Sequence, residues 1–275
     1  IKLDTTFCFH PWHKLQLTEF ALTSIMNSSF GLDAVNIALL PGDNGKGNKP
    51  LPLVITPRWE SSKLFIVSWC RENRVWLDAM LLQYGAVLIR GFTLDTPADM
   101  QEAIQAYHHD LNNTYRGTSP RRLMEGTDYV FSAAEVPANY PIAQHLEMSF
   151  LDAPPRQLFF GCIKQSDSAG GETALADFRQ VYRDLDTDLK QKLLDQGIRY
   201  QRTHKKVGSY YPFDVADMLG WPEVFGTDDK EQVEKMCAEE GVPVEWDGDT
   251  FVSVTKSNAF QLHPSTKEPV WSCLL

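Results

Sequence analysis

Strand-like and helix-like segments follow one another along this chain without regular alternation, and that order limits the fold classes open to it. The run from Tyr84 to Phe92 (YGAVLIRGF) is apolar, β-branched and bounded by glycines, which is typical of a buried strand. Arg156 to Lys164 (RQLFFGCIK) is a second strand-like run. Helical spacing of apolar residues predicts one or two helices over Glu60 to Gln83. A doubly wound parallel sheet requires regular alternation, so we predict an α+β fold in which a β core carries helical insertions.

Local start and stop signals predict the limits of the other helices. Thr96-Pro97-Ala98-Asp99 places a hydroxyl before a proline and an acid, which begins a helix that we expect to run to about His109. Asp177 to Gly197 has a helical apolar face with a break at Thr187-Asp188 and a glycine stop. A further helix is predicted over Asp228 to Glu240.

The length of 275 residues is enough for one large domain with a substantial core. We therefore expect a single domain over residues 1–275. Residues 1–50 look irregular, and Pro41 to Asn48 is expected to be an exposed loop because turn-forming residues fill it.

The formal net charge of −10 argues against a nucleic-acid partner and against an anionic membrane surface, because both require a basic face. The apolar runs are also far too short to span a bilayer.

The five cysteines are scattered without a CxxC pair, so we expect free and mostly buried thiols rather than disulfides or a zinc–thiolate site. Such thiols fit a reducing compartment, and no signal-peptide pattern follows Ile1, so we expect a cytoplasmic protein.

His145-Leu146-Glu147 is the strongest chemical signal in the chain. Prolines hold the preceding residues out of helix, and we expect the triplet on a strand, where residues i and i+2 point to the same face. An imidazole and a carboxylate so placed can reach one metal ion, as in the two-His-one-carboxylate triad of Fe(II) sites. The alternative is a solvated His–Glu pair, since such triplets are common by chance. His108-His109-Asp110 has the same pattern, but at the end of a helix its outer members point about 200° apart and cannot grip one ion.

Gly170-Gly171-Glu172-Thr173 predicts a tight turn in which the backbone can approach a ligand closely. Thr173 then offers a hydroxyl to a carboxylate. Taken alone, an ordinary hairpin turn explains the same four residues.

Together, these motifs resemble those of the taurine dioxygenase and clavaminate synthase-like family of Fe(II), 2-oxoglutarate-dependent oxygenases. The similarity extends from Pro52 to Trp271, nearly the whole chain, and its pieces occur in the family's order. The matching segments are 84–92, Tyr115 with Gly117–Arg121 (GTSPR), Gln144–Phe150 (QHLEMSF), 154–182, and Trp246 with Leu262–Trp271.

The resemblance implies a fold, a cofactor and a reaction. The fold is a double-stranded β-helix, or jelly-roll, core. Fe(II) would be held by His145 and Glu147, with 2-oxoglutarate as co-substrate and Thr173 near a carboxylate of that co-substrate. The reaction would be the oxidation of a small molecule by molecular oxygen, with release of succinate and CO2.

The chain departs from the family pattern beyond Trp271. In the family, a last metal-binding His and an Arg for the distal carboxylate of 2-oxoglutarate follow this point, whereas this chain stops at Leu275. We therefore expect the core to lack its last strands and the third iron ligand to be absent. His263 is the candidate replacement ligand, although it aligns with the structural His of a His-Pro turn. Arg121 or Arg202 are the candidates for the arginine.

Two functional hypotheses from different classes follow. The first is an oxygenase whose truncated form is weakly active or inactive alone. The second is a non-catalytic relative, a truncated form or pseudoenzyme that acts by binding. The intact His145, Glu147 and Thr173 favour the first, and the missing ligands favour the second. No motif specifies the substrate or the oligomeric state.

Overall fold

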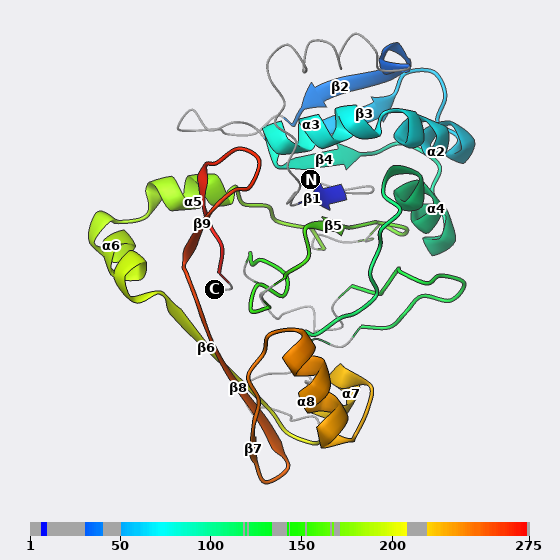
Figure 1. The fold of residues 1–275 in the computed structure, drawn as a ribbon. Coiled ribbons are helices and arrows are strands. Elements are labelled where there is room, and N and C mark those ends of the chain that lie inside the picture. The colour runs from blue at the N-terminus through cyan, green and yellow to red at the C-terminus, as the bar shows by residue number, and fades with distance from the viewer. Residues whose placement is uncertain are drawn as a thin grey trace.

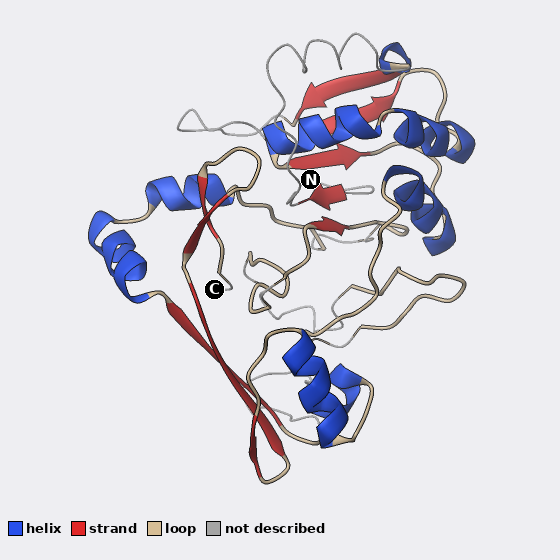
Figure 2. Ribbon diagram, viewed as in Figure 1, coloured by secondary structure: helices blue, strands red, loops and turns tan. Residues whose placement is uncertain are grey.

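The structure, a computed structural model, describes residues 7–9 (backbone only), 31–40, 51–117, 119, 121–133, 142, 144–151, 153–165, 167, 171–207 and 219–273. Helices and sheets are mixed without regular alternation, as the α+β prediction requires (Figure 2). The loop predicted over residues 41–48 lies outside the described residues.

A mixed five-stranded sheet contains the first five strands of the chain (Figure 1). Its strands are β1 (Phe7–Phe9), β2 (Val35–Leu39), β3 (Leu53–Pro57), β4 (Ala86–Ile89) and β5 (Gln157–Phe159), in the order β2-β3-β4-β1-β5. The pairing is antiparallel except between β3 and β4, which are parallel. A short 3-10 turn, η1 (Leu32–Ala34), leads into β2. All four residues of β4 are buried, which confirms the strand predicted between the two glycines.

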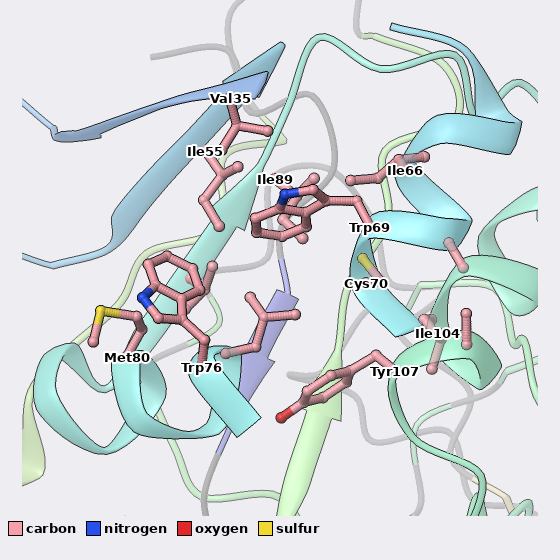
Figure 3. Packing of buried hydrophobic residues seen from close by; sticks show 14 of the residues in the cluster. Val35, Ile55, Ile66, Trp69, Cys70, Trp76, Met80, Ile89, Ile104 and Tyr107 are labelled. Carbon is pink, nitrogen blue, oxygen red and sulfur yellow. The ribbon is translucent and has the colours of Figure 1, made fainter. Parts of the chain in front are cut away.

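Three helices, α2 (Lys63–Glu72), α3 (Arg74–Tyr84) and α4 (Pro97–Tyr107), pack with this sheet around the largest core (Figure 3). Trp69 and Trp76 meet edge to face with ring centroids 5.9 Å apart, and both contribute to the cluster that contains Ile55 of β3 and Ile89 of β4. The apolar spacing over Glu60 to Gln83 therefore corresponds to two consecutive helices.

A three-stranded antiparallel sheet with its own helices forms a second core. The sheet has the order β6-β8-β7, with β6 (Ile198–His204), β7 (Glu245–Asp247) and β8 (Thr250–Ser257). Helices α7 (Trp221–Phe225) and α8 (Lys230–Glu239) lie at one end of this sheet (Figure 1). Trp221, Val233 and Phe251 are completely buried there.

A third, smaller core forms where the hairpin of β9 (Phe260–Leu262) and β10 (Pro269–Trp271) meets helices α5 (Phe178–Asp184) and α6 (Thr187–Gln196). Tyr182 and Trp271 each meet the Phe260 ring edge to face, with centroids 5.0 and 5.7 Å away. The described strands thus belong to three separate sheets, and the jelly-roll arrangement stays a prediction.

Helix starts follow the local signals of the sequence. Five helices begin at a residue whose side chain accepts a hydrogen bond from a backbone N–H of the first turn: Ser62, Thr96, Asp177, Asp186 and Asp229. At Thr96 the reciprocal capping box with Asp99 is complete, and Pro97 occupies the first turn. The stop at Gly197 is confirmed, whereas the break lies at Leu185-Asp186, and Thr187 and Asp188 are the first residues of α6 because Asp186 caps that helix.

Two strand predictions need correction. Residues 1–50 are not irregular throughout, because β1 and β2 lie within them and pair with β4, β5 and β3. The strand predicted over Arg156–Lys164 is reduced to Gln157–Phe159, since among the described residues it pairs with the three residues of β1. In both cases the available partner strand, rather than the local sequence, sets the limits of the strand.

Cys70, Cys237 and Cys273 are free and buried, and Cys162 is free and half-buried, which confirms the thiol prediction for these four. The side chain of Cys8 is outside the described set. Within the part of the chain that the structure describes, no helix is both long and apolar enough to cross a membrane.

Candidate functional site

His145 and Glu147 lie in an irregular segment and a turn, not on the predicted strand. The described residues between α4 and β5 form loops, with one isolated bridge between Leu123 and Phe131 (Figure 2). Strand pairing therefore cannot be what orients the two side chains.

The segment that carries His145 and Glu147 is instead held in place by packing of residues within and just after it. Leu146 packs against the third core and Leu151 against the second, so the short stretch between them is attached to two separate apolar clusters. Met148 adopts a left-handed backbone conformation with φ 49°, and its sulfur accepts a hydrogen bond from the Arg116 backbone N–H at 3.1 Å. A positive φ is unusual for a residue with a side chain and persists where the surroundings enforce it.

The two predicted ligands are brought together in spite of the missing strand. His145 Nε2 lies 3.7 Å from Glu147 Oε2, with the side chains 35% and 18% exposed. Imidazole and carboxylate ligands bind divalent metals at about 2.0–2.2 Å, so one ion can contact both atoms at this separation. The donors are of the types that suit non-haem Fe(II).

The environment of Glu147 favours its charged form. Burial raises the pKa of the Glu147 carboxyl, but the hydrogen bond from His145 and the nearby Arg121 guanidinium together lower it below the ordinary value. A metal-binding carboxylate must be deprotonated, so this electrostatic setting suits a ligand. The Arg121 guanidinium is close to this carboxylate, with Nη2 3.5 Å from Glu147 Oε2.

Arg121 is positioned by an aromatic ring in the GTSPR motif. Its guanidinium lies over the Tyr115 ring, 5.0 Å from the centroid. The Tyr115 ring in turn lies directly against Gly117, where any Cβ would overlap it. Arg121 Nε is buried and has no hydrogen-bond partner within the described part of the chain.

Thr173 lies half-buried in the connection between β5 and α5, two residues after Gly171, which has a φ of 81°. The positive φ agrees with the predicted tight turn. No hydrogen bond joins Thr173 to His145 or Glu147 among the residues that the structure describes. Its predicted role near a co-substrate carboxylate stays a prediction.

His263 organises the β9–β10 turn. The ring is buried, and its Nδ1 accepts backbone N–H groups from Ser265 at 3.3 Å and Thr266 at 3.1 Å. Within the described ranges, no group of three His, Cys, Asp or Glu side chains could hold a metal ion, so His263 does not join His145 and Glu147 as a third ligand. The alignment with a structural His is consistent with this geometry.

The second triplet, His108-His109-Asp110, lies just beyond α4 rather than within it. His108 has an extended backbone, so the helical argument against a shared metal does not apply. Instead, other contacts occupy the side chains. His108 Nδ1 accepts the Asp110 backbone N–H at 3.3 Å, and His109 Nε2 lies 2.7 Å from an Arg74 guanidinium nitrogen.

A second cluster of charges adjoins the His145–Glu147 segment, and it contains Arg202, one of the two candidates for the missing arginine. Arg116 Nε donates to Glu240 Oε1 at 2.8 Å, and the Arg116 guanidinium lies over the Phe225 ring. Arg202, on β6, donates to the Arg116 backbone carbonyl at 2.7 Å and lies over the Phe150 ring. Only the inward position of Arg202 in an alternating strand pattern could have indicated this cluster from the sequence.

Comparison with known proteins relates the whole region to one family. The sequence pattern described as taurine catabolism dioxygenase TauD, TfdA family matches residues 49–273. The chain is 28% identical to the dapdiamide synthesis protein DdaC of Enterobacter agglomerans over 197 residues, which are 71% of this chain but 56% of DdaC. It is 28% identical over 243 residues to a clavaminate synthase-like protein of Arabidopsis thaliana, with 84% of this chain and 72% of that protein covered. The chain therefore spans little more than half the length of DdaC.

Proposed function

The chain belongs to the taurine catabolism dioxygenase TauD, TfdA family, and from that membership we propose that it carries the iron site of an Fe(II)- and 2-oxoglutarate-dependent oxygenase. The observation that carries the proposal is the approach of His145 Nε2 to within 3.7 Å of Glu147 Oε2. This imidazole and this carboxylate lie close together although neither is on a strand. The segment that carries them is attached to the second and third cores through Leu151 and Leu146. A solvated His–Glu pair would need no such attachment.

In this proposal His145 and Glu147 are two of the iron ligands, and Thr173 interacts with a carboxylate of 2-oxoglutarate. When bound, Fe(II) and 2-oxoglutarate would activate molecular oxygen for the oxidation of a small molecule, and 2-oxoglutarate would be converted to succinate and CO2. Glu147 contributes a negative charge that favours cation binding. Arg121, next to Glu147, limits the orientations of that carboxylate, and Leu146 anchors the backbone between the two ligands.

The remaining family features belong to the same proposal. We propose that the chain forms one oxygenase-like domain in the cytoplasm and that its strands are part of a jelly-roll core. Both relatives are 28% identical to this chain, so their names support the family's chemistry without specifying a substrate. DdaC is named for dapdiamide synthesis, and the proposal for this chain extends only to a small-molecule substrate.

The test is to add Fe(II) and 2-oxoglutarate to the purified chain without oxygen and to record the visible charge-transfer band of the chelate. We expect a band in the wild-type chain and its loss in His145→Ala. His109→Ala is the matched control, because it removes an imidazole from the other triplet and should leave the band intact. If a folded wild-type chain gives no band, the oxygenase proposal is wrong and the non-catalytic relative that acts by binding replaces it.

A further inference from the structure

Helix α8 ends on an acidic residue, where the electrostatics of a helix favour a basic or neutral one. Glu240 is the C-terminal cap of this helix and follows Glu239, its last residue. The C-terminal end of a helix carries partial negative charge from its free carbonyl groups, so a carboxylate there is destabilising. Glu239 is exposed, whereas the Glu240 side chain is 27% exposed and has a cation beside it. The stability of α8 by itself therefore gives no reason for an acid at position 240.

The cation beside Glu240 is Arg116, which lies in a loop 124 residues earlier in the sequence. Arg116 Nε donates to Glu240 Oε1 at 2.8 Å. Its Nη1 donates to the Val224 carbonyl at 3.4 Å, and the guanidinium lies over the Phe225 ring, 5.2 Å from the centroid. The Arg116 side chain is 11% exposed, so removal of Glu240 would leave a largely buried charge without its counter-charge. These contacts attach Arg116 to the second core.

The backbone of Arg116 is bound to the segment that carries the candidate ligands. Its N–H donates to the Met148 sulfur at 3.1 Å, and its carbonyl accepts from Arg202 Nη2 at 2.7 Å. Arg202 in turn lies over the Phe150 ring, 3.7 Å from the centroid. Arg116 is not part of a strand, so these hydrogen bonds satisfy backbone groups that a sheet would otherwise pair. Two residues of the turn that begins at Glu147 are thus held by Arg116, directly or through Arg202.

Met148 follows Glu147 directly and has a backbone conformation that needs such support. Its φ is 49°, and the residue is 8% exposed. A left-handed conformation is unfavourable for a residue with a side chain and persists where the surroundings enforce it. The hydrogen bond from the Arg116 N–H is one such restraint, because it fixes the Met148 sulfur from outside the turn. The Met148 backbone sets the direction in which the chain leaves Glu147.

We propose that Glu240 is a positioning residue for the His145–Glu147 pair. It acts through Arg116, which is bound to Met148 next to Glu147. The inference rests on the proposed function where it assigns a metal ion to that pair. Without the charge of Glu240, the Arg116 guanidinium turns toward water, and the Arg116 backbone is held less firmly against Met148. Glu147 then samples more orientations, and a carboxylate that meets His145 less often binds a metal ion more weakly.

The first experiment measures amide hydrogen exchange of the metal-free chain by mass spectrometry, in peptides that cover residues 144–151. We expect faster exchange of this segment in Glu240→Gln, which keeps the size and an oxygen acceptor but removes the charge. Glu239→Gln is the matched control, because it removes the same charge from an exposed position at the same helix end. It should leave the exchange of residues 144–151 unchanged. A role in helix stability alone would change the exchange of α8 but not of residues 144–151.

The second experiment measures the affinity of the same proteins for Co(II) by isothermal titration calorimetry. Co(II) binds the nitrogen and oxygen donors that suit Fe(II). We expect about tenfold weaker binding in Glu240→Gln, as for groups that orient metal ligands from outside the coordination shell, and no change in Glu239→Gln. Urea denaturation checks that each variant is folded under these conditions. If Glu240→Gln does not fold, Glu240→Asp, which moves the carboxylate by one methylene, replaces it in both measurements.

A double variant tests the route through Met148. Met148→Leu removes the sulfur acceptor with little change in volume and should weaken Co(II) binding by a similar factor. If Glu240 acts through Met148, the double variant binds Co(II) no more weakly than the worse of the two single variants. Losses that add in the double variant would refute this route.

The proposal is wrong if the folded Glu240 variant has wild-type exchange over residues 144–151. It is also wrong if the wild-type chain binds Co(II) and that variant binds it equally tightly. A wild-type chain that does not bind Co(II) refutes the iron site of the proposed function instead. Hydrogen exchange then decides the role of Glu240 by itself, since faster exchange of residues 144–151 supports it and unchanged exchange overturns it.

Discussion

We expect the stability of this protein to fall as the pH decreases from about 6.5 to about 4, and His204 to be a main cause. His204 ends strand β6, is 6% exposed and meets the Phe251 ring edge to face at 5.5 Å. The pKa of its imidazole is lowered from 6.5 to about 4, mainly by burial and also by the charge of Arg202, although a hydrogen bond with the Leu219 backbone acts in the opposite direction. His204 is therefore neutral in the folded protein at neutral pH.

The sign follows from where the proton binds. Above the unfolded pKa of about 6.5, His204 is neutral in both states and costs nothing. As the pH falls below 6.5, His204 takes up a proton in the unfolded chain but not in the folded chain. The free energy of unfolding therefore decreases until the pH reaches the folded pKa of about 4, below which both states are protonated. A pKa difference of about 2.5 at 1.36 kcal/mol per unit gives a loss of roughly 3 kcal/mol as an upper value.

The assay is urea denaturation at a series of pH values between 7.5 and 4, comparing the wild-type chain with His204→Gln. Glutamine keeps a polar group without a titrating one, so the variant should be less stable at pH 7 but should lose less stability on acidification. Thr203→Ala, an exposed change on the same strand, should keep the wild-type dependence on pH. If wild-type chain and His204→Gln lose stability in parallel across this range, the assigned burial of a neutral imidazole is wrong.

Two further predictions concern stability. Phe251→Ala should lower the free energy of unfolding by about 3–5 kcal/mol, because this fully buried ring meets Trp246, His204 and Phe225, while Lys256→Ala on the same strand should change it by less than about 0.5 kcal/mol. A loss below about 1 kcal/mol in urea denaturation would contradict the central place of Phe251 in the second core. Thr96→Ala should cost about 1 kcal/mol because it removes the acceptor of the capping box, and Thr96→Ser should restore most of it. Equal midpoints for all three proteins in the same assay would show that the cap contributes nothing.

The helices of this protein were predictable because their signals are local. The hydroxyl of Thr96 caps the Asp99 N–H only three residues away, and Asp186 caps α6 within the same distance. The strand at Ala86–Ile89 was predictable because a run of apolar residues between glycines has few other stable positions in a folded chain. None of these features depends on residues far away in the sequence.

Strand lengths and the orientation of the site were not predictable in this way. Gln157–Phe159 is short because its partner β1 is short, and the two are separated by about half of the chain. His145 and Glu147 approach each other through the attachment of Leu146 and Leu151 to two different cores, whereas the expected mechanism was strand alternation. The sequence thus predicted correctly that His145 and Glu147 lie close together, but the cause is packing against two cores and not the alternation of a strand.

The sequence by itself determined which residues start and stop the helices, which run forms the central buried strand, and which imidazole and carboxylate are candidates for a metal site. Each of these features depends on residues a few positions apart, and over that distance the sequence spacing determines how the side chains lie relative to one another. Tertiary structure alone decided that Arg116, from a loop, and Arg202, from β6, meet beside the segment of Glu147, although 86 residues separate them. A guanidinium carries no local signal of its eventual partner, so whether it is neutralised, solvated or left to bind a ligand is settled only when distant segments pack together.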